Sequence, residues 1–363
     1  MSTTNDFIFF SASDTVANGS FTCSAPSNIA LVKYWGKKEN QIPANPSVSF
    51  TLTDCKTITT LIFTKKKDQN NFSFELLFEG QPKPDFNPKI QKFLERILPY
   101  CPFLNWYHFS IATQNTFPHS SGIASSASGM AALALTIMSL EKVLNPSISD
   151  EHFYKKASFL ARLGSGSACR SIKGSVVVWG EQADMENSSD LYGVAFPTKI
   201  HEHFNNYQDT ILLVDQGEKQ VSSTVGHDLM HQHPFATQRF EQARHHLSAM
   251  KSVLETGNLV EFIKIVESEA LTLHAMMLTS MPYFILMKPN TLEIIQKIWK
   301  FRNETQLPLC FTLDAGANVH VLYPENVRVK VLQFIQDELV GYCQNGQYIC
   351  DQIGTGSQII LEN

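Results

Sequence analysis

The most informative segment of the chain is Phe117-Pro118-His119-Ser120-Ser121-Gly122-Ile123-Ala124-Ser125-Ser126-Ala127-Ser128-Gly129, which leads directly into a long run of Ala, Ser, Leu and Met. Small residues before a helix let backbone N–H groups and hydroxyls approach a phosphate at the positive helix end. The segment matches neither the G-x-x-x-x-G-K-[ST] phosphate loop nor the G-x-G-x-x-G dinucleotide loop. By itself it fits a phosphate site and a tightly packed helix start equally well.

The pattern of apolar residues around this segment predicts a mixture of strands and helices. The strands that we expect lie at residues 48–53, 57–63, 72–78, 106–112, 174–179, 211–214, 309–313, 319–323 and 358–361. The helices lie at residues 88–98, 124–143, 151–162, 235–255, 259–277, 291–302 and 327–339. Because strands and helices do not alternate regularly, this order favours an α+β fold over a doubly wound sheet.

Composition narrows the class of protein. The 363 residues suggest two domains or one large one, and 43% hydrophobic with 17% charged residues allow a sizeable core. The net charge of −5 differs from the overall positive charge that is typical of nucleic-acid-binding proteins. No apolar run approaches the roughly 18 residues of a membrane span, and the N-terminus does not read as a signal peptide. Seven scattered cysteines favour reduced thiols in the cytoplasm.

Five motifs in order resemble those of the diphosphomevalonate decarboxylases, which belong to the GHMP small-molecule kinase superfamily. Their phosphate loop, P-x-x-x-G-[LI]-x-S-S-[AS], matches the segment quoted first. The other motifs are residues 24–37 (SAPSNIALVKYWGK) with 43–49 (PANPSVS), 164–171 (GSGSACRS), 221–226 (VSSTVG) and 314–318 (DAGAN). Two positions depart from the family pattern: Ala317 replaces a proline, and His227 stands where methionine is common.

The resemblance implies a two-domain GHMP kinase fold with its active site in the cleft between the domains. Residues 1–190 would form a nucleotide-binding domain like the second domain of ribosomal protein S5, and residues 191–363 a ferredoxin-like domain. The implied reaction uses ATP and Mg²⁺ to phosphorylate the 3-hydroxyl of mevalonate 5-diphosphate, which then loses phosphate and carbon dioxide to give isopentenyl diphosphate in isoprenoid biosynthesis. Three alternatives stay open: a mevalonate 3-kinase, a phosphomevalonate decarboxylase and a non-catalytic ligand-binding relative. Homodimers are common in the family.

The resemblance also implies roles for four candidate catalytic residues. Asp314 would face the 3-hydroxyl as a proton acceptor or orienting group. Arg170 is suited to a bidentate grip on the substrate carboxylate. Lys33 would meet the negative charge on the transferring oxygens. Asn28 would hydrogen-bond the substrate or Asp314, and this is the weakest of the four assignments.

The remaining assignments concern binding. The substrate-binding candidates are Tyr34, Lys37, Ser222, Ser223 and Thr224. For Lys37, a charged side chain in a solvent-exposed turn is an equally good interpretation. The nucleotide-binding candidates are Asn115, Gly122, Ala124, Ser125 and Ser126. The hydroxyl of Ser125 is also a candidate ligand for Mg²⁺, which keeps several waters and shares phosphate oxygens with few protein groups.

Histidines and a cysteine near these motifs are expected to be structural. The histidines His227, His231 and His233 match no zinc spacing, and a solvated helix start is the favoured interpretation. We interpret His274 as a hydrogen-bonded core histidine and Cys169 as a small packing residue.

Overall fold

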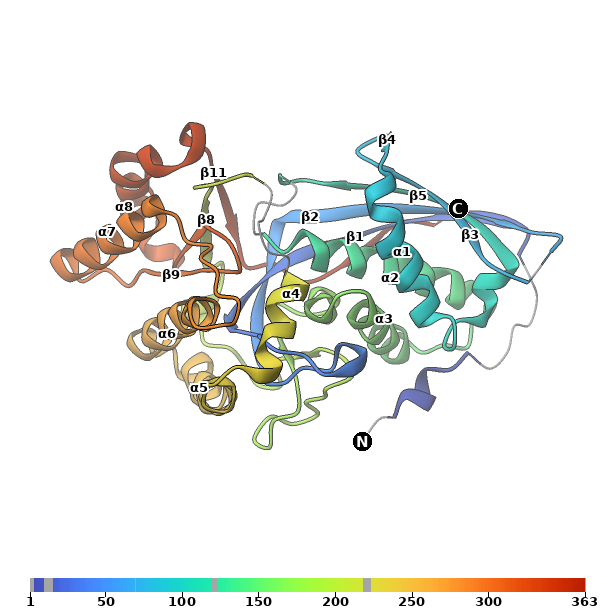
Figure 1. The fold of residues 1–363 in the computed structure, drawn as a ribbon, viewed down its shortest axis with the longest axis horizontal. Helices are drawn as coiled ribbons and strands as arrows, with labels where there is room; N and C mark the ends of the chain where they lie inside the picture. The colour runs from blue at the N-terminus through green and yellow to red at the C-terminus, as the bar shows by residue number, and fades with distance from the viewer. Residues whose placement is uncertain (1–2, 10–15, 69, 119–122, 218–222, 363) are drawn as a thin grey trace.

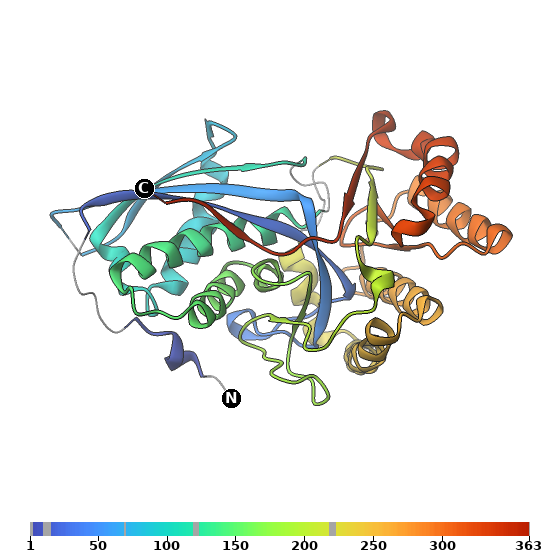
Figure 2. The same cartoon turned by 180° about the vertical axis from the view of Figure 1, so that it is seen from behind.

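The computed structural model describes residues 3–9, 16–68, 70–118, 123–217 and 223–362. Figure 1 shows a large sheet with helices α1, α2 and α3 on one face, and a smaller sheet at the other end of the molecule. Helices α5 to α8 surround the smaller sheet, and the reverse view shows the same division (Figure 2). The α+β class predicted from the order of elements is therefore confirmed.

The large sheet has the strand order β12-β1-β2-β5-β3-β4, with β6 paired to β2 and β7 paired to β6. Its neighbours are antiparallel except for β3 and β5, which run parallel. The strands are β1 (Asn18–Val32), β2 (Ser47–Lys65), β3 (Ser73–Phe78), β4 (Gln81–Pro82), β5 (Tyr107–Asn115), β6 (Val176–Trp179), β7 (Val194–Ala195) and β12 (Gln358–Glu362). The last strand of the predicted C-terminal domain thus pairs with β1 in the N-terminal sheet.

The strands predicted at residues 48–53 and 57–63 are in fact one continuous strand, β2. The polar residues between them stay extended because Asp351 accepts hydrogen bonds from their main chain. Its carboxylate receives the N–H groups of Thr53 at 3.0 Å and of Cys55 at 2.7 Å. Hydrogen bonds to a side chain almost 300 positions away therefore keep the backbone extended where the local sequence suggested a turn.

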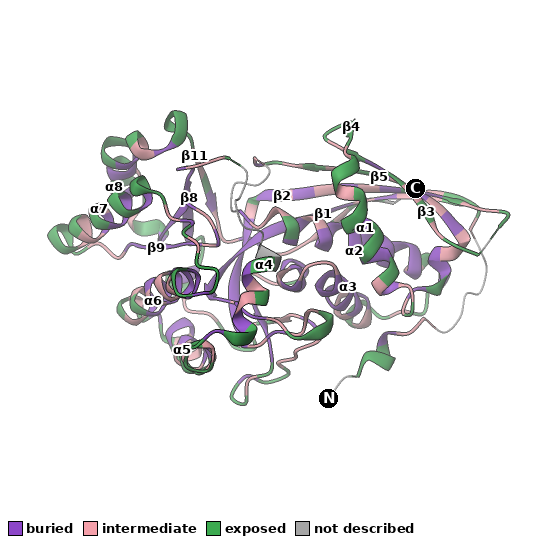
Figure 3. Ribbon diagram, in the orientation of Figure 1, coloured by how far each residue is buried: buried purple, intermediate pink, exposed green. Residues whose placement is uncertain are grey.

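Helix α2 (Ser125–Leu144) forms the centre of the N-terminal core and packs on β1 and α3. Its length and mean hydropathy are sufficient for a membrane span, but 83% of that window is buried inside the protein, as is usual for a core helix. The burial map shows this helix enclosed beneath the sheet (Figure 3). It is flanked by α1 (Asn87–Ile97) and α3 (Asp150–Gly164).

The smaller sheet has the order β11-β8-β10-β9 and is antiparallel throughout. Its strands are β8 (Gln208–Leu212), β9 (Cys310–Thr312), β10 (Val319–Tyr323) and β11 (Tyr348–Gln352), of which β11 was not predicted. The helices of this half of the chain are α4 (Ser223–Asp228), α5 (Ala236–Thr256), α6 (Leu259–Leu278), α7 (Pro289–Thr305) and α8 (Arg328–Phe334). The helix expected at 327–339 continues past α8 as a π-helical turn over Ile335–Leu339. The boundary at 190/191 stays a prediction.

Candidate active site

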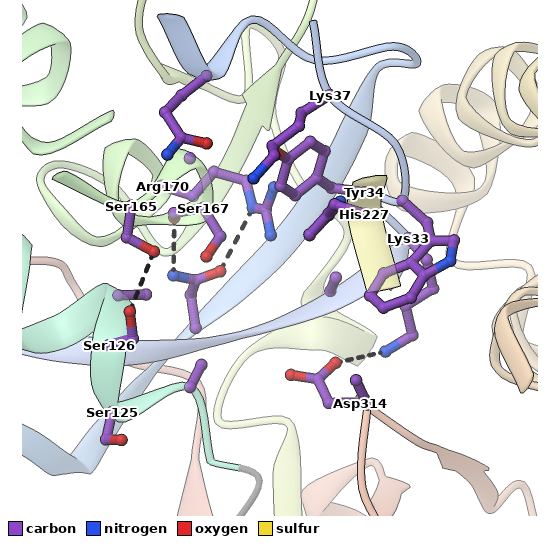
Figure 4. A pocket seen from close by; sticks show the side chains of 18 of the residues that line it. Lys33, Tyr34, Lys37, Ser125, Ser126, Ser165, Ser167, Arg170, His227 and Asp314 are labelled. Atoms are coloured by element: carbon purple, nitrogen blue, oxygen red, sulfur yellow. Dashed lines mark hydrogen bonds and ion pairs between the residues drawn. The ribbon is translucent and has the colours of Figure 1, made fainter. Parts of the chain in front are cut away.

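A cavity of about 220 Å³ lies where the two sheets meet. It is bordered by the end of β1, the 3₁₀ turn Gly166–Ser171, the start of α2 and the loop between β9 and β10. Residues predicted for the site from four separate motifs line it together (Figure 4). They are Asn28, Lys33, Tyr34, Lys37, Ala124, Ser125, Ser126, Arg170 and Asp314.

The charged centre of the cavity is the pair formed by Lys33 and Asp314. Lys33 Nζ lies 2.9 Å from Asp314 Oδ1, and the lysine side chain is only 2% exposed whereas that of Asp314 is 24% exposed. Burial lowers the pKa of Lys33, and the carboxylate of Asp314 opposes this shift. Asp314 therefore presents an ion-paired carboxylate with one side open to the cavity.

His274 supports the loop that carries Asp314. Its Nε2 lies 3.1 Å from the backbone oxygen of Asp314, and burial lowers the pKa of His274 to about 4. A neutral imidazole whose Nε2 carries the proton donates this bond. The expectation of a hydrogen-bonded core histidine is thus confirmed.

Arg170 is buried and is held by neutral oxygen atoms. Its Nη1 donates to Ser47 Oγ at 2.7 Å and its Nε to Ser49 Oγ at 2.9 Å. Nε also contacts Asn28 Oδ1 at 3.3 Å. Burial lowers the pKa of Arg170, although a guanidinium stays protonated. Its positive charge therefore has no carboxylate bonded to it among the described residues, and an anion in the cavity would neutralise it.

Asn28 faces Arg170 and its turn. Its Nδ2 donates to Ser171 Oγ at 2.7 Å and to Ser167 O at 3.2 Å, while Oδ1 accepts from Arg170. Both ends of the amide are thus occupied with the arginine segment. This geometry makes Asn28 a positioning residue for Arg170, and its predicted bond to Asp314 or substrate stays a prediction.

The expectation of a solvated position was wrong for His227, which lines the cavity. Its ring lies against Tyr34 and Trp35, with centroids 4.3 and 4.5 Å away, and Nδ1 accepts the Gly36 N–H at 2.9 Å. Burial lowers the pKa of His227 to about 3, so the ring is neutral. The missed signal is Gly226, where an added Cβ would lie 2.5 Å from Trp35 and prevent this close approach.

Lys37 also lines the cavity, with a side chain 15% exposed and an ion pair to Asp228 at 3.4 Å. A fully solvated turn is therefore not its environment. Of the other predicted contacts, Gly122 and Ser222 lie outside the described residues. Ser223 and Thr224 begin α4, and only their backbone is described.

The start of α2 places two hydroxyls and one unexpected cation at the cavity. Ala124 has a left-handed φ of 48°, which turns the chain into the helix. Ser126 Oγ accepts from Lys89 Nζ at 2.7 Å and donates to Ser165 Oγ at 3.2 Å. Sequence analysis missed Lys89 because nothing in the local pattern of α1 distinguishes it from a solvated lysine. The structure thus adds a lysine beside the predicted phosphate loop.

A second cavity of about 160 Å³ adjoins the first and shares Lys89, Ser125 and Ser126 with it. Asn115 lines this second cavity, and its Oδ1 accepts from Thr57 Oγ1 at 2.7 Å. The other walls are mostly apolar: Leu76, Phe78, Phe86, Ile90, Ile111, Met130 and Leu133. An apolar pocket beside a hydroxyl-rich helix start suits a flat nucleobase next to its phosphates.

The oxygen donors at the cavity are compatible with Mg²⁺. No group of three or more His, Cys, Asp or Glu that could hold a metal occurs in the part of the chain that the structure describes. Magnesium needs no such cage, because it binds through one or two protein oxygens together with phosphate oxygens and water. The hydroxyls of Ser125 and Ser126 supply hard oxygen ligands of this kind.

Comparison with known proteins assigns both halves of the chain. Residues 25–190 match the model of a diphosphomevalonate decarboxylase-like N-terminal domain, and residues 210–357 that of a mevalonate 5-diphosphate decarboxylase C-terminal domain. The diphosphomevalonate decarboxylase of Debaryomyces hansenii is 30% identical over 86% of this chain and 82% of its own. That of Candida albicans is 29% identical over 87% of both chains.

Solved structures agree with these matches. The mevalonate diphosphate decarboxylase of Legionella pneumophila has a TM-score of 0.76 and 30% identity, covering 91% of this chain and all of its own. A structure described as "MDDEF in complex with MVAPP, AMPPCP and Magnesium" has a TM-score of 0.80 and 29% identity, covering 95% and 99%. This chain belongs to the diphosphomevalonate decarboxylase family.

Proposed function

We propose that this chain is an ATP-dependent decarboxylase that converts mevalonate 5-diphosphate to isopentenyl diphosphate after phosphorylating its 3-hydroxyl. The observation that carries the proposal is the convergence of Asp314, Lys33 and Arg170 on one cavity that also contains the start of α2. A related structure that binds MVAPP, AMPPCP and magnesium supports the same substrates and metal here.

The chemistry needs a hydroxyl to become a good leaving group. Hydroxide leaves poorly, whereas a phosphate ester on a tertiary carbon departs readily as positive charge develops on that carbon. In this proposal Asp314 accepts the hydroxyl proton or orients the hydroxyl toward the terminal phosphoryl group. Lys33 forms an ion pair with this carboxylate and brings positive charge next to the transferring oxygens.

Arg170 is suited to hold the carboxylate that leaves as carbon dioxide. Nε and Nη1 donate to hydroxyls behind it, while none of the described residues is bonded to Nη2. A strong grip on the carboxylate stabilises the ground state as well, and only stronger binding of the transition state accelerates the step. We therefore assign Arg170 to substrate positioning.

ATP would place its phosphates at the start of α2 and its base in the second cavity. Lys89, Ser125 and Ser126 border both cavities and so lie where the phosphates would pass from one to the other. Mg²⁺, held with phosphate oxygens by Ser125 and Ser126, would neutralise charge on the phosphates. The backbone N–H groups at the helix start add to this field.

A substrate-range assay tests the proposed function. Purified protein is mixed with ATP and Mg²⁺ and with mevalonate, its 5-phosphate or its 5-diphosphate, and ADP, phosphate and carbon dioxide are measured. All three products with the 5-diphosphate are the expected result. ADP without carbon dioxide would indicate a 3-kinase, turnover of only the 5-phosphate a monophosphate decarboxylase, and no turnover a binding protein. Each of these three outcomes would overturn the proposal.

The environment of the cysteines supports the further proposal of a cytoplasmic location. All seven lie in the described ranges, none of them forms a disulfide, and six of them are buried. Burial raises the pKa of Cys169 to about 12, as befits a packing residue. Thiols that form no disulfide suit a reducing compartment. The expected homodimer and the expected lack of nucleic-acid and membrane partners stay predictions.

A further inference from the structure

The main chain of Lys33 is held by side chains rather than by the sheet. The residue follows the last position of β1, where Val32 pairs with Val48. Its N–H donates to Glu269 Oε2 at 2.8 Å. Its carbonyl oxygen accepts from Arg239 Nη2 at 3.1 Å and from Asn45 Nδ2, in the loop before β2, at 2.9 Å. Glu269 and Arg239 thus bind both polar groups of this position from other elements, and Asn45 shares the carbonyl oxygen.

Glu269 and Arg239 are themselves completely buried. Glu269 lies on α6 and Arg239 on α5, and both side chains are 0% exposed. Arg239 donates from Nη1 to Glu269 Oε1 at 2.9 Å and from Nη2 to Oε2. His246 Nδ1 contacts Oε1 at 2.6 Å, so both carboxylate oxygens of Glu269 accept at least two bonds. Burial alone would raise the pKa of Glu269, but Arg239, His246 and the Lys33 N–H lower it, and the carboxylate stays ionised.

These contacts connect the two halves of the molecule at the reacting groups. Lys33 extends from β1 in the large sheet, whereas Asp314 follows β9 in the smaller one, 281 positions later. Helix α6 packs on both β1 and β9. The same helix therefore fixes the main chain of the lysine and supports the strand that leads to its partner.

We propose that Glu269 and Arg239 form a positioning clamp that fixes the main chain of Lys33 and thereby sets the reach of its Nζ to Asp314 and the substrate. The proposal rests on the proposed function, because it assigns a role in that reaction. A lysine side chain has four rotatable bonds, so its end is positioned only if its backbone is fixed. Displacement of a reacting group by about 1 Å can cost about 100-fold in rate.

The clamp also acts on Lys33 through charge. Asp314 and Glu269 favour the protonated amine, whereas burial and Arg170 oppose it, and His274 faces the amine as a neutral ring. Removal of the negative charge of Glu269 should lower the pKa of Lys33 further. The deprotonated amine no longer forms the ion pair with Asp314. The loss of activity at alkaline pH should therefore begin at a lower pH in a variant without the Glu269 charge than in the wild type.

Two variants test the clamp, and each is compared with the wild type. Glu269→Gln keeps the shape and removes the charge, and Arg239→Lys keeps the charge but loses the fork that reaches both Glu269 and the Lys33 carbonyl. We expect kcat to fall about 10- to 100-fold in each, with KM for ATP within about twofold. A second readout is the pH dependence of Lys33 labelling by an amine reagent, measured by mass spectrometry. In Glu269→Gln its midpoint should move to lower pH.

A matched control separates positioning from stability. Glu141 and Lys156 form another buried pair, 2.7 Å apart and 3% and 0% exposed, away from the residues that line either cavity. Glu141→Gln should weaken folding while kcat and the Lys33 labelling profile stay at wild-type values. A wild-type kcat or a wild-type labelling profile in Glu269→Gln would overturn the clamp. If Glu269→Gln does not fold, a wild-type kcat in Arg239→Lys contradicts the clamp proposal.

Assays of the wild type distinguish failure of the clamp proposal from failure of the proposed function. Absence of turnover with mevalonate 5-diphosphate in the wild type contradicts the proposed function. The labelling profile needs no turnover, so it still tests whether Glu269 acts on Lys33. An unshifted profile then rejects the clamp independently.

Discussion

Two buried lysines in this molecule form ion pairs of nearly the same length but with different surroundings. Lys33 Nζ lies 2.9 Å from Asp314, and Lys156 Nζ lies 2.7 Å from Glu141. The second pair is sealed between α2 and α3, where the lysine also donates to the backbone oxygen of Tyr100 at 3.1 Å. The first pair opens on the cavity through the carboxylate, which is 24% exposed.

The difference is in what the carboxylate can still bind. Glu141 has one oxygen on Lys156 and the other 3.7 Å from the Cys101 thiol, so neither faces water or a ligand. Asp314 keeps an open side toward the cavity that also contains Arg170. The same two functional groups therefore stabilise the fold in one place and are available for proton transfer in the other. The predictions that follow separate these two uses.

Asp314→Ala should have the largest effect on activity. Removal of a positioned proton acceptor is expected to lower kcat by about 10²- to 10⁴-fold. Loss of the partner of the buried Lys33 should also lower the folding stability, but ATP and substrate should still bind. Steady-state kinetics and calorimetric titration with a non-hydrolysable ATP analogue measure both effects. Near-normal turnover would remove Asp314 from the mechanism.

Glu141→Gln should instead have its effect on stability. Breaking a buried pair leaves the Lys156 charge uncompensated, which typically costs about 3–5 kcal/mol of unfolding free energy. Urea denaturation followed by circular dichroism measures this loss, and kinetics on the folded protein should match the wild type. A reduced kcat with unchanged stability would show that the two pairs do not differ as we describe.

Arg170→Gln should have a smaller effect than either. Loss of charge-assisted hydrogen bonds to the substrate carboxylate is expected to cost about 1.5–3 kcal/mol, which corresponds to about 10- to 150-fold in kcat/KM. Because the described residues bonded to the guanidinium contribute only neutral oxygens, folding should not weaken in the same proportion. An unchanged kcat/KM would contradict the assigned grip on the carboxylate.

The sequence predicted what local patterns determine. The small-residue start of α2 and the DAGAN loop were assigned to the site because they belong to five motifs that occur in the order of one family, and both line the cavity. Most helices lay within a few residues of their predicted ends because apolar spacing marks their buried faces. The continuity of β2 was missed, since it depends on Asp351 binding the main chain from a distant strand.

The missed parts of the site depend on tertiary contacts in the same way. Glu269 and Arg239 lie on ordinary amphipathic helices, and only their meeting with Lys33, more than 200 positions earlier, gives them a role. Lys89 likewise becomes part of the site only through Ser126. His227 was assigned to a solvated helix start because the spacing of the three histidines matches no zinc site, whereas its ring lies against Tyr34 and Trp35.

Glu338→Gln should have the smallest effect and completes the comparison of lysine pairs. Glu338 lies 2.9 Å from Lys297 Nζ, the same distance as in the Lys33–Asp314 pair, but the two side chains are 53% and 31% exposed. Water and salt screen such a pair, and holding two long side chains together costs entropy. The urea midpoint and kcat should therefore both match the wild type within error. A loss of stability as large as that of Glu141→Gln would mean that distance, rather than burial, determines what a lysine pair contributes in this protein.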